Sequence, residues 1–413
     1  MSETNPEPEA ALHGGTLESR LDALRTMCAS AEPKLRKGTN LHIHTNESFS
    51  VFRSPTEAVW QAVTEGVAVL GINDHYTCAG HDEFRQACEI AGIPATFSME
   101  AVSMDRDAEA AGDLTNDPGN PGRTYLCAKG VTQIPPDDSP EVQPLMKMRA
   151  ALGARNREMT GKVQGVFQSE VGEDGPTWDD VVALTPHGNA TERHVSKAVF
   201  IRLEELAGTA VSEAVAQLCG DDPPDDDDAT LQNFIRAKLL KAGAPCFVGE
   251  SPDAFLDIEP MRNLFLAFGA IPTYPVLGNP VTQREEDIPA LLERLEKINI
   301  FALEVIPQRN TRERLAEIVG AARERHWPVF NGTEHNTPAP APLLVKNGLD
   351  PEFLPWFEQS AALLLGHHRI VEQGEPGFVN ADGLPSIPDA LERFERFSRA
   401  GREVWEKVEQ SSE

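Results

Sequence analysis

Histidines and carboxylates occur in this sequence at a spacing that suits metal coordination. His42 and His44 stand two residues apart in an apolar segment, and Asp74 and His75 follow a second apolar run. On a β-strand, residues i and i+2 face the same side, so both imidazoles can point into one site as two ligands of one ion. Glu100 adds an oxygen ligand. Such a mixed set of histidine and carboxylate ligands is typical of zinc, manganese or iron.

The segments between these residues predict how the ligands come together. Residues 40–44 alternate as in a short strand, and residues 54–57 (Ser-Pro-Thr-Glu) carry the start signals of a helix that Gly66 ends. Residues 67–72 form an apolar run typical of a strand buried on both faces. Strands joined by a β-α-β crossover are parallel and end at the same edge of the sheet. We therefore expect the histidines at neighbouring strand ends.

A second β-α-β unit is predicted over residues 300–332, and Glu334 and His335 follow it. Between the two units, strands are predicted to end at Glu100 and near Tyr274. Repeated α/β units with polar residues at their strand ends predict a barrel whose site lies at the C-terminal face of the strands.

The charge of the chain argues against several classes of partner. The 413 residues include 65 acidic and 37 basic side chains, which gives a net charge of −28. This charge repels nucleic acid and anionic membranes, so we expect neither as a partner and expect a small-molecule substrate instead. The oligomeric state is not indicated by the sequence.

The cysteines and the N-terminal residues favour a cytoplasmic protein. The six cysteines are scattered, without a CxxC pair, as in a reduced protein. The first fifteen residues lack the basic and apolar regions of a secretion signal. No apolar run reaches the roughly eighteen residues of a membrane-spanning helix.

Several motifs, in order, resemble those of the polymerase and histidinol phosphatase (PHP) family. That family pairs an HxH strand end with a later DH strand end, as in NLHIHTNES and VAVLGINDH here. Between residues 39 and 340, further segments are similar to later motifs of the family: FSMEAVSM, ATERHVSKAVFIRL, FALEVI and NGTEHNTP. The resemblance implies a distorted (β/α)7-type TIM-like barrel with loop and helical insertions. It also implies two or three divalent ions and hydrolysis of a phosphate ester by a metal-bound hydroxide.

The resemblance also implies roles for particular residues. Glu100 corresponds to a bridging ligand, and either Glu334, His335 or Asn336 completes the last motif. His187 is an alternative to His194, although the RHVSKA context favours His194. The metal ligands implied in this way are His42, His44, His75, Glu100, His194, Glu334 and His335.

Two further groups of residues are candidates for contact with the substrate. Where the family has Ala-His-Pro, this chain has Thr-Tyr-Pro, so Tyr274 either weakens one metal position or hydrogen-bonds the substrate. Asp74 is expected to orient a histidine ligand or to take a proton from water. We therefore assign Asp74 and Tyr274 catalytic roles. Arg193 and Arg309 are candidate phosphate clamps, because a guanidinium matches phosphate oxygens.

These observations predict a chain organised around one barrel. The expected divisions are an N-terminal tail and surface helix (residues 1–37), the barrel (38–345) with an insertion around 205–245, and a C-terminal helical extension (346–413). The predicted function is that of a metal-dependent phosphoesterase acting on a small phosphorylated metabolite. Hydrolysis of a non-phosphate ester or amide is an alternative, because an acidic chain repels anionic substrates. A degenerate, non-catalytic binding module is another.

Overall fold

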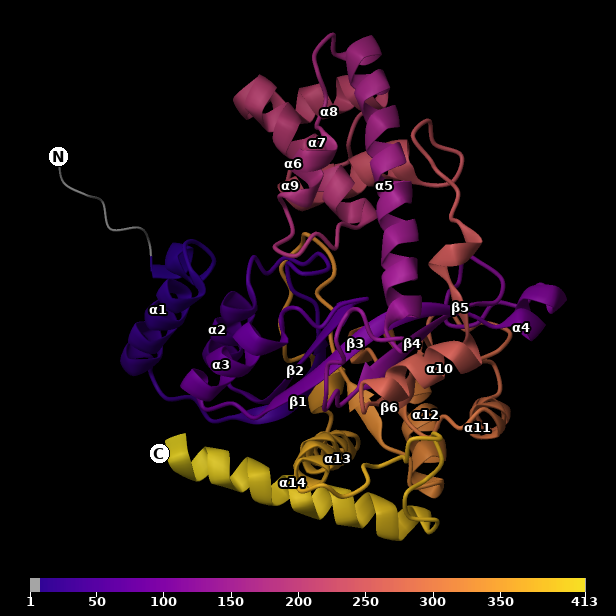
Figure 1. The fold of residues 1–413 in the computed structure, drawn as a ribbon. Coiled ribbons are helices and arrows are strands. Elements are labelled where there is room, and N and C mark those ends of the chain that lie inside the picture. The colour runs from indigo at the N-terminus through magenta and orange to yellow at the C-terminus, as the bar shows by residue number, and fades with distance from the viewer. Residues whose placement is uncertain (1–7, 413) are drawn as a thin grey trace.

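A ring of seven strands forms the centre of the molecule. A computed structural model describes residues 8–412, so the first seven residues of the predicted tail lie outside the described part. Around the ring, in spatial order, run β1 (Lys37–Ile43), β2 (Val67–His75), β3 (Ala95–Met104), β4 (Arg123–Lys129), β6 (Ile271–Val276), β7 (Leu303–Val305) and β8 (Val329–Asn331). The two-residue β5 (Leu256–Asp257) pairs with β3. The predicted TIM-like barrel is confirmed (Figure 1).

The ring departs from a regular barrel at β4. Most neighbouring strands are parallel, but β4 runs antiparallel to both β3 and β6. The two ends of the ring meet where Ile43 bridges Glu334, and the His44 amide donates to the Glu334 carbonyl at 2.7 Å. The ring is therefore nearly closed, and the C-terminal ends of the parallel strands gather at one face.

Helices cover the outside of the barrel as the local sequence predicts. Ser54 caps α2 by accepting the amide hydrogen of Glu57, and Gly66 ends it in the left-handed conformation (φ 76°). The helices around the barrel are α1 (Leu17–Ser30), α2 (Pro55–Glu65), α3 (His81–Ala91), α4 (Arg106–Ala111), α10 (Ile258–Ala267), α11 (Ile288–Lys297) and α12 (Arg312–Glu324). Short turns are η1 (Pro8–Leu12), η4 (Pro252–Ala254), η5 (Pro307–Arg309) and η6 (Lys346–Leu349). None of the helices within residues 8–412 is both long and apolar enough to cross a membrane.

A second group of helices stands over the strand ends, and we call it the helical cluster (Figure 1). It consists of α5 (Gln143–Glu170), α6 (Trp178–Val182), α7 (Glu192–Ala207), η2 (Gly208–Ala210), α8 (Val211–Cys219), α9 (Asp228–Ile235) and η3 (Arg236–Leu240). It has an apolar core of its own, which includes Met159 and Val163 of α5. Leu145 and Met148, earlier in the same helix, belong to the barrel core. The long helix α5 thus joins the two cores.

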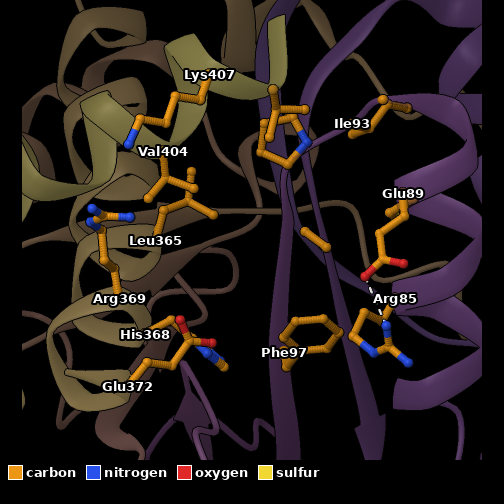
Figure 2. A pocket seen from close by; sticks show the side chains of 15 residues that line it. Arg85, Glu89, Ile93, Phe97, Leu365, His368, Arg369, Glu372, Val404 and Lys407 are labelled. Carbon is orange, nitrogen blue, oxygen red and sulfur yellow. Dashed lines mark hydrogen bonds and ion pairs between the residues drawn. The ribbon is translucent and has the colours of Figure 1, made fainter. Parts of the chain in front are cut away.

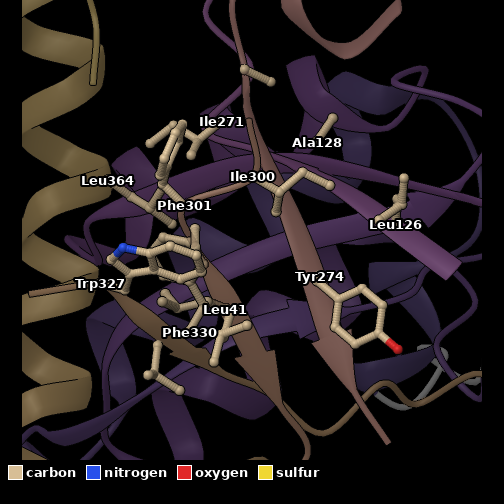
Figure 3. Packing of buried hydrophobic residues seen from close by; sticks show 14 of the residues in the cluster. Leu41, Leu126, Ala128, Ile271, Tyr274, Ile300, Phe301, Trp327, Phe330 and Leu364 are labelled. Carbon is tan, nitrogen blue, oxygen red and sulfur yellow. The ribbon is translucent and has the colours of Figure 1, made fainter. Parts of the chain in front are cut away.

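The main apolar core is made of side chains from the strands and from the segments packed against them (Figure 3). Leu41, Leu126 and Phe330 from three strands are fully buried in it. The aromatic rings of Phe301 and Trp327 meet edge to face at 5.7 Å. This packing holds the strands in register, and the register sets where the polar side chains at their ends project.

A cavity of about 510 Å³ lies at the start of β3, away from the strand ends (Figure 2). It opens between α3 on one side and the C-terminal helices α13 (Leu354–Glu372) and α14 (Ala390–Ser412) on the other. Phe97 and Leu365 line its apolar part, and the Arg85–Glu89 ion pair lies at its rim. None of His42, His44 and Glu100 lines this cavity.

Helices α13 and α14 cross at two glycines. A methyl group at Gly401 would lie 1.6 Å from the carbonyl oxygen of Ala362, and one at Gly366 would lie 1.9 Å from that of Phe397. The backbones therefore touch directly, and the close approach requires the absence of both side chains.

We predict that Gly401→Ala destabilises the fold, because the added methyl group has to push α14 away from α13. The expected loss is about 1–3 kcal/mol in the free energy of unfolding, measured by urea denaturation. The matched control is Gly320→Ala in α12, where a methyl group meets nothing within 4 Å. That change should stabilise the helix by about 0.5–1 kcal/mol. Equal effects of the two substitutions would contradict the close crossing.

Candidate metal centre

Four predicted ligands converge at the ends of β1 and β2 and in the middle of β3, which runs on to Met104 instead of ending at Glu100 as the sequence predicts. The Nε2 atoms of His42 and His44 lie 3.0 Å apart. One carboxylate oxygen of Glu100, Oε2, lies 3.7 Å and 3.5 Å from these two nitrogens. The same oxygen lies 3.2 Å from Nδ1 of His75. The parallel register places His75 directly beside Glu100 on the neighbouring strand, which explains their contact.

The spacing of these atoms fits a bound divalent ion. Bonds of about 2.0–2.2 Å from zinc to nitrogen or oxygen place tetrahedral neighbours roughly 3.4 Å apart. His42, His44 and Glu100 are buried and satisfy the distances of a shared ion. Oδ1 of Asn73 is buried without a hydrogen-bond partner among the described residues, and Nδ1 of His75 contacts Glu100 without the geometry of a hydrogen bond. Buried polar atoms are normally satisfied, so the pocket suits a group that these atoms bind.

The loop after β1 orients His44. Nδ1 of His44 lies 3.1 Å from the Ser48 hydroxyl oxygen, and that hydroxyl group in turn donates to Asp74 at 2.5 Å. Asp74 also accepts the amide and hydroxyl hydrogens of Thr45, each at 2.7 Å. These bonds turn Nε2 of His44 toward Glu100, which is the usual way in which a metal-binding histidine is held. Three hydrogen-bond donors engage the Asp74 carboxylate, an arrangement that suits the predicted role of orienting a histidine ligand.

Glu304 orients His42 from the opposite side. Its Oε1 atom lies 3.0 Å from Nδ1 of His42 and 2.5 Å from Nζ of Lys129, and its Oε2 atom accepts the Cys127 thiol hydrogen at 3.1 Å. Glu304 and Lys129 are both fully buried. The side-chain nitrogen Nδ2 of Asn73 lies 2.9 Å from Nε2 of His42, and an ion bound at this nitrogen would have to replace that contact. His42 thus has a carboxylate at one nitrogen and the candidate ion position at the other.

Burial and charge set the protonation of these groups in the metal-free chain. Burial lowers the pKa of His75 to about 3, and burial together with the charge of His42 lowers the pKa of His44 well below its usual value. Both imidazoles are therefore neutral near pH 7 and able to bind a metal. Burial alone would raise the pKa of Glu304, but His42 and Lys129 outweigh it and lower that pKa to about 2.

A cavity of about 280 Å³ opens onto His75 and Glu100. Arg193, Arg309 and Glu334 also line it. Arg309 forms an ion pair with Glu334, whereas no carboxylate among the described residues pairs with Arg193. Burial, followed by the charge of Arg236, lowers the pKa of Arg193 to about 10, so its guanidinium stays charged.

Two predicted ligands, His194 and His335, contact other groups of the chain through their ring nitrogens. Nδ1 of His194 accepts the Thr191 amide hydrogen at 2.9 Å, so its proton sits on Nε2 and no lone pair is left for a metal. Both nitrogens of His335 contact protein oxygens, namely the Thr333 hydroxyl at 2.8 Å and the Ala341 carbonyl at 2.9 Å. Among residues 8–412, neither His194 nor His335 belongs to the two groups of side chains with the spacing of a cation site. His187 contacts the Glu47 carboxylate at 2.9 Å.

Tyr274 faces away from the cluster. Pro275 pairs in register with Glu304, and strand alternation puts Tyr274 on the opposite face of β6. The Tyr274 ring is buried in the main core, as Figure 3 shows, and its hydroxyl group donates to Glu285 at 3.1 Å. This placement gives no support to the predicted catalytic role. The sequence places Tyr274 at a strand end but does not show to which face it turns.

Sequence reasoning assigned no metal-site role to Glu304, Cys127 or Lys129. The strand containing Glu304 was predicted, but not the contact of its carboxylate with His42. The strand β4, which carries Cys127 and Lys129, was not predicted. Its apolar run Tyr-Leu-Cys-Ala after Gly122 is the signal that could have indicated it.

Comparisons with known proteins support the fold. A solved structure of a Bifidobacterium adolescentis protein, provisionally named a metal-dependent phosphoesterase, is similar with a TM-score of 0.53 and 20% identity, over 80% of this chain and 98% of that one. An amidohydrolase from Chromobacterium violaceum, solved with bound sulfate and no metal, is similar with a TM-score of 0.50 and 15% identity, over 72% and 87% of the two chains.

In sequence, the match to a curated protein is short. A 5'-3' exoribonuclease from Haemophilus influenzae is 41% identical over 66 residues, which are 16% of this chain and 24% of that protein. The chain therefore spans about a quarter of the length of this relative. No protein-family model matches the chain, so membership of the PHP family stays a prediction.

We predict that Ser48→Ala weakens metal binding, because it removes the hydroxyl group that holds Nδ1 of His44. The expected loss of Zn²⁺ or Mn²⁺ affinity is about 10-fold to 100-fold, as for other outer partners of ligand histidines. Isothermal titration of the chelator-treated protein measures it. Asp82→Ala, which removes an exposed partner of Arg85, is the control. Unchanged affinity in Ser48→Ala would contradict the proposed orientation of His44.

A second prediction concerns the pH dependence of stability. Burial lowers the pKa of His194 to about 3, whereas an unfolded histidine titrates near about 6.5. Between these values the unfolded chain binds a proton that the folded chain does not, so the contribution of His194 falls as the pH falls. His194→Asn keeps a hydrogen-bond acceptor but does not titrate. The stability of the wild type relative to this variant should therefore drop by about 2 kcal/mol from pH 7 to pH 5.

Urea unfolding of both chains in the presence of a chelator measures this difference. Because every other titrating group is shared by the two chains, its contribution cancels. A difference in stability that does not change with pH would show that His194 is free to protonate in the folded state.

Proposed function

We propose that the protein is a metal-dependent phosphoesterase that acts on a small phosphorylated metabolite. The observation that carries the proposal is the cluster of His42, His44, His75 and Glu100. Two of its members, His75 and Glu100, line a cavity together with Arg193, which has no carboxylate partner among residues 8–412. The residues suit zinc, manganese or iron, and the resemblance to the PHP family implies two or three ions.

A second cavity next to the cluster favours an anionic substrate. It has a volume of about 230 Å³ and lies between the barrel and the helical cluster. It shares His75 and Tyr125 with the cavity of about 280 Å³ that Arg193 lines. Five basic residues line it against only two acidic residues, Glu192 and Glu250. The basic residues are Arg123, Arg149, Arg155, Arg236 and Lys241.

In this basic cavity of about 230 Å³, one carboxylate forms ion pairs with three cationic side chains. Glu192 lies 3.2 Å from Arg155, 2.8 Å from Arg236 and 2.7 Å from Lys241. The cations therefore exceed the acids around the cleft, although the chain as a whole carries a net charge of −28. A local positive field in a cleft attracts anions even on an acidic protein. The net negative charge of the chain is therefore no longer an argument against a phosphorylated substrate.

The roles of the residues follow from their positions. When bound, a divalent ion supplies an activated water and a positive charge for a phosphoryl oxygen. His42, His44, His75 and Glu100 would hold it, and Asp74 and Glu304 keep two of these imidazoles in the productive orientation. Arg193 would bind phosphate oxygens. Arg309 would also bind them from its own side of the cavity if its ion pair with Glu334 broke.

The comparisons support the reaction class in different degrees. The likeness to the provisionally named phosphoesterase and to the amidohydrolase supports a hydrolase fold, and neither likeness selects the bond that is cleaved. The short match to an exoribonuclease adds support for phosphoester chemistry, because an exoribonuclease cleaves phosphodiester bonds. The basic second cavity is the feature that favours phosphate over a neutral ester or amide.

The test compares two chromogenic substrates. The chelator-treated protein is reloaded with Mn²⁺ or Zn²⁺ and assayed with p-nitrophenyl phosphate and p-nitrophenyl acetate. We expect metal-dependent hydrolysis of the phosphate ester that His44→Ala abolishes. Hydrolysis of the acetate alone would favour the non-phosphate alternative, and hydrolysis of a short oligoribonucleotide alone would place the substrate closer to that of the exoribonuclease. No metal-dependent activity on any of the three would favour a binding module.

We further predict that Arg193→Ala lowers kcat/KM for the phosphate ester by about 10-fold to 100-fold, because a charge-assisted hydrogen bond contributes about 1.5–3 kcal/mol. Most of the loss should appear in KM if Arg193 binds the substrate before reaction. Arg202→Ala, in the same helix but paired with Glu205, is the matched control. An unchanged KM in Arg193→Ala would remove Arg193 from the proposed phosphate site.

A further inference from the structure

Two overlapping sets of side chains in the barrel have the spacing of a cation site. One set is His42, His44 and Glu100, and the other is His42, Cys127 and Glu304. In each set the ligand atoms lie within 4.8 Å of one another. His42 belongs to both because Nε2 faces the first set and Nδ1 faces Glu304. From spacing alone, an ion could lie on either side of His42.

The Glu304 side already contains a positive charge. Nζ of Lys129 lies 2.5 Å from Oε1 of Glu304 and donates to the Leu41 carbonyl oxygen at 2.9 Å. Lys129 is fully buried, so water does not screen its ammonium group. The other carboxylate oxygen of Glu304 accepts the Cys127 thiol hydrogen. Both oxygens of Glu304 are therefore in contact with groups of the chain itself.

The thiol also fits a position without a metal. A metal-bound cysteine is a thiolate, but burial and the charge of Glu304 raise the pKa of Cys127 well above its usual value. A protonated Cys127 serves as a hydrogen-bond donor to Glu304, which is the contact seen. The His44 side differs, because among the described residues no lysine or arginine forms an ion pair with Glu100 there.

We propose that Lys129 is a built-in replacement for a metal ion. Its ammonium group compensates Glu304 and closes the Glu304 side of the centre to divalent cations, so that ions bind only on the side of His44 and Glu100. This inference rests on the proposed metal site but not on the proposed phosphoester substrate. Removing the ammonium group should therefore create a new ion position, bounded by Glu304, Cys127 and the Leu41 carbonyl.

Counting bound zinc tests the proposal without any assay of activity. The wild type, Lys129→Ala and Lys129→Ala/Glu304→Gln are saturated with Zn²⁺, desalted and analysed for zinc per chain. We expect Lys129→Ala to bind one more Zn²⁺ per chain than the wild type, and the double variant to return to the wild-type number. Lys238→Ala, which removes an exposed partner of Asp221, is the control and should match the wild type.

Two results would overturn the proposal. One is a folded Lys129→Ala protein with the same zinc content as the wild type. The other is a Lys129→Ala/Glu304→Gln protein that keeps the extra zinc ion, because the new position would then not involve Glu304. Absence of zinc from the wild type would overturn the proposed metal site, and an extra ion in Lys129→Ala would still support the role of Lys129.

Thermal unfolding covers the case in which Lys129→Ala does not fold. Lys129→Met keeps the volume of the side chain but leaves Glu304 buried without its cation. In a chelator, its Tm should fall well below that of the wild type, and Lys129→Met/Glu304→Gln should recover most of the loss. Equal Tm values for the two methionine variants would show that Lys129 does not compensate Glu304 and would overturn the proposal.

Discussion

Charge inside the barrel has to be balanced inside the barrel, because water does not reach it. Glu304 is fully buried, and an isolated carboxylate there would cost several kcal/mol. Nζ of Lys129 and Nδ1 of His42 lie within 3.0 Å of Oε1 of Glu304 and offset that cost. The same contacts hold His42 in place, and the ring of strands supplies all three groups. The geometry of the candidate metal centre therefore depends on this buried pairing more than on the apolar packing around it.

The candidate metal centre and the basic cavity above it differ in how their charges are balanced. Inside the barrel, Glu304 has cationic and hydrogen-bonding partners close by, and His44 and His75 stay neutral because burial opposes their protonation. Above the strand ends, Glu192 leaves its three cations incompletely neutralised. A strongly acidic protein can in this way keep a positive entrance to a site. Net charge alone therefore says little about which substrates a cleft accepts.

The parts of the site that follow from local pattern could be predicted from the sequence. His42 and His44 alternate on one strand, and the β-α-β crossover brings His75 and Glu100 beside them. The parts that depend on strand order could not. The strand β4 runs antiparallel between β3 and β6, and no local signal shows that Lys129 lies next to Glu304, which is far away in the sequence. The same holds for His194, because a single backbone amide decides whether its nitrogen is available.

The long helix α5 has a mechanical consequence for the cleft. Its first turns are fixed in the barrel core by Leu145 and Met148, and its later turns are fixed in the helical cluster by Met159 and Val163. The segment between these anchors lines the basic cavity and contains Gly153, which has no neighbour within 4 Å of a potential side chain. Widening the cavity at this wall therefore requires α5 to bend, and Gly153 lowers the stiffness of the helix at that point. The bending stiffness of α5 thus limits the size of the ligand that the basic cavity can admit.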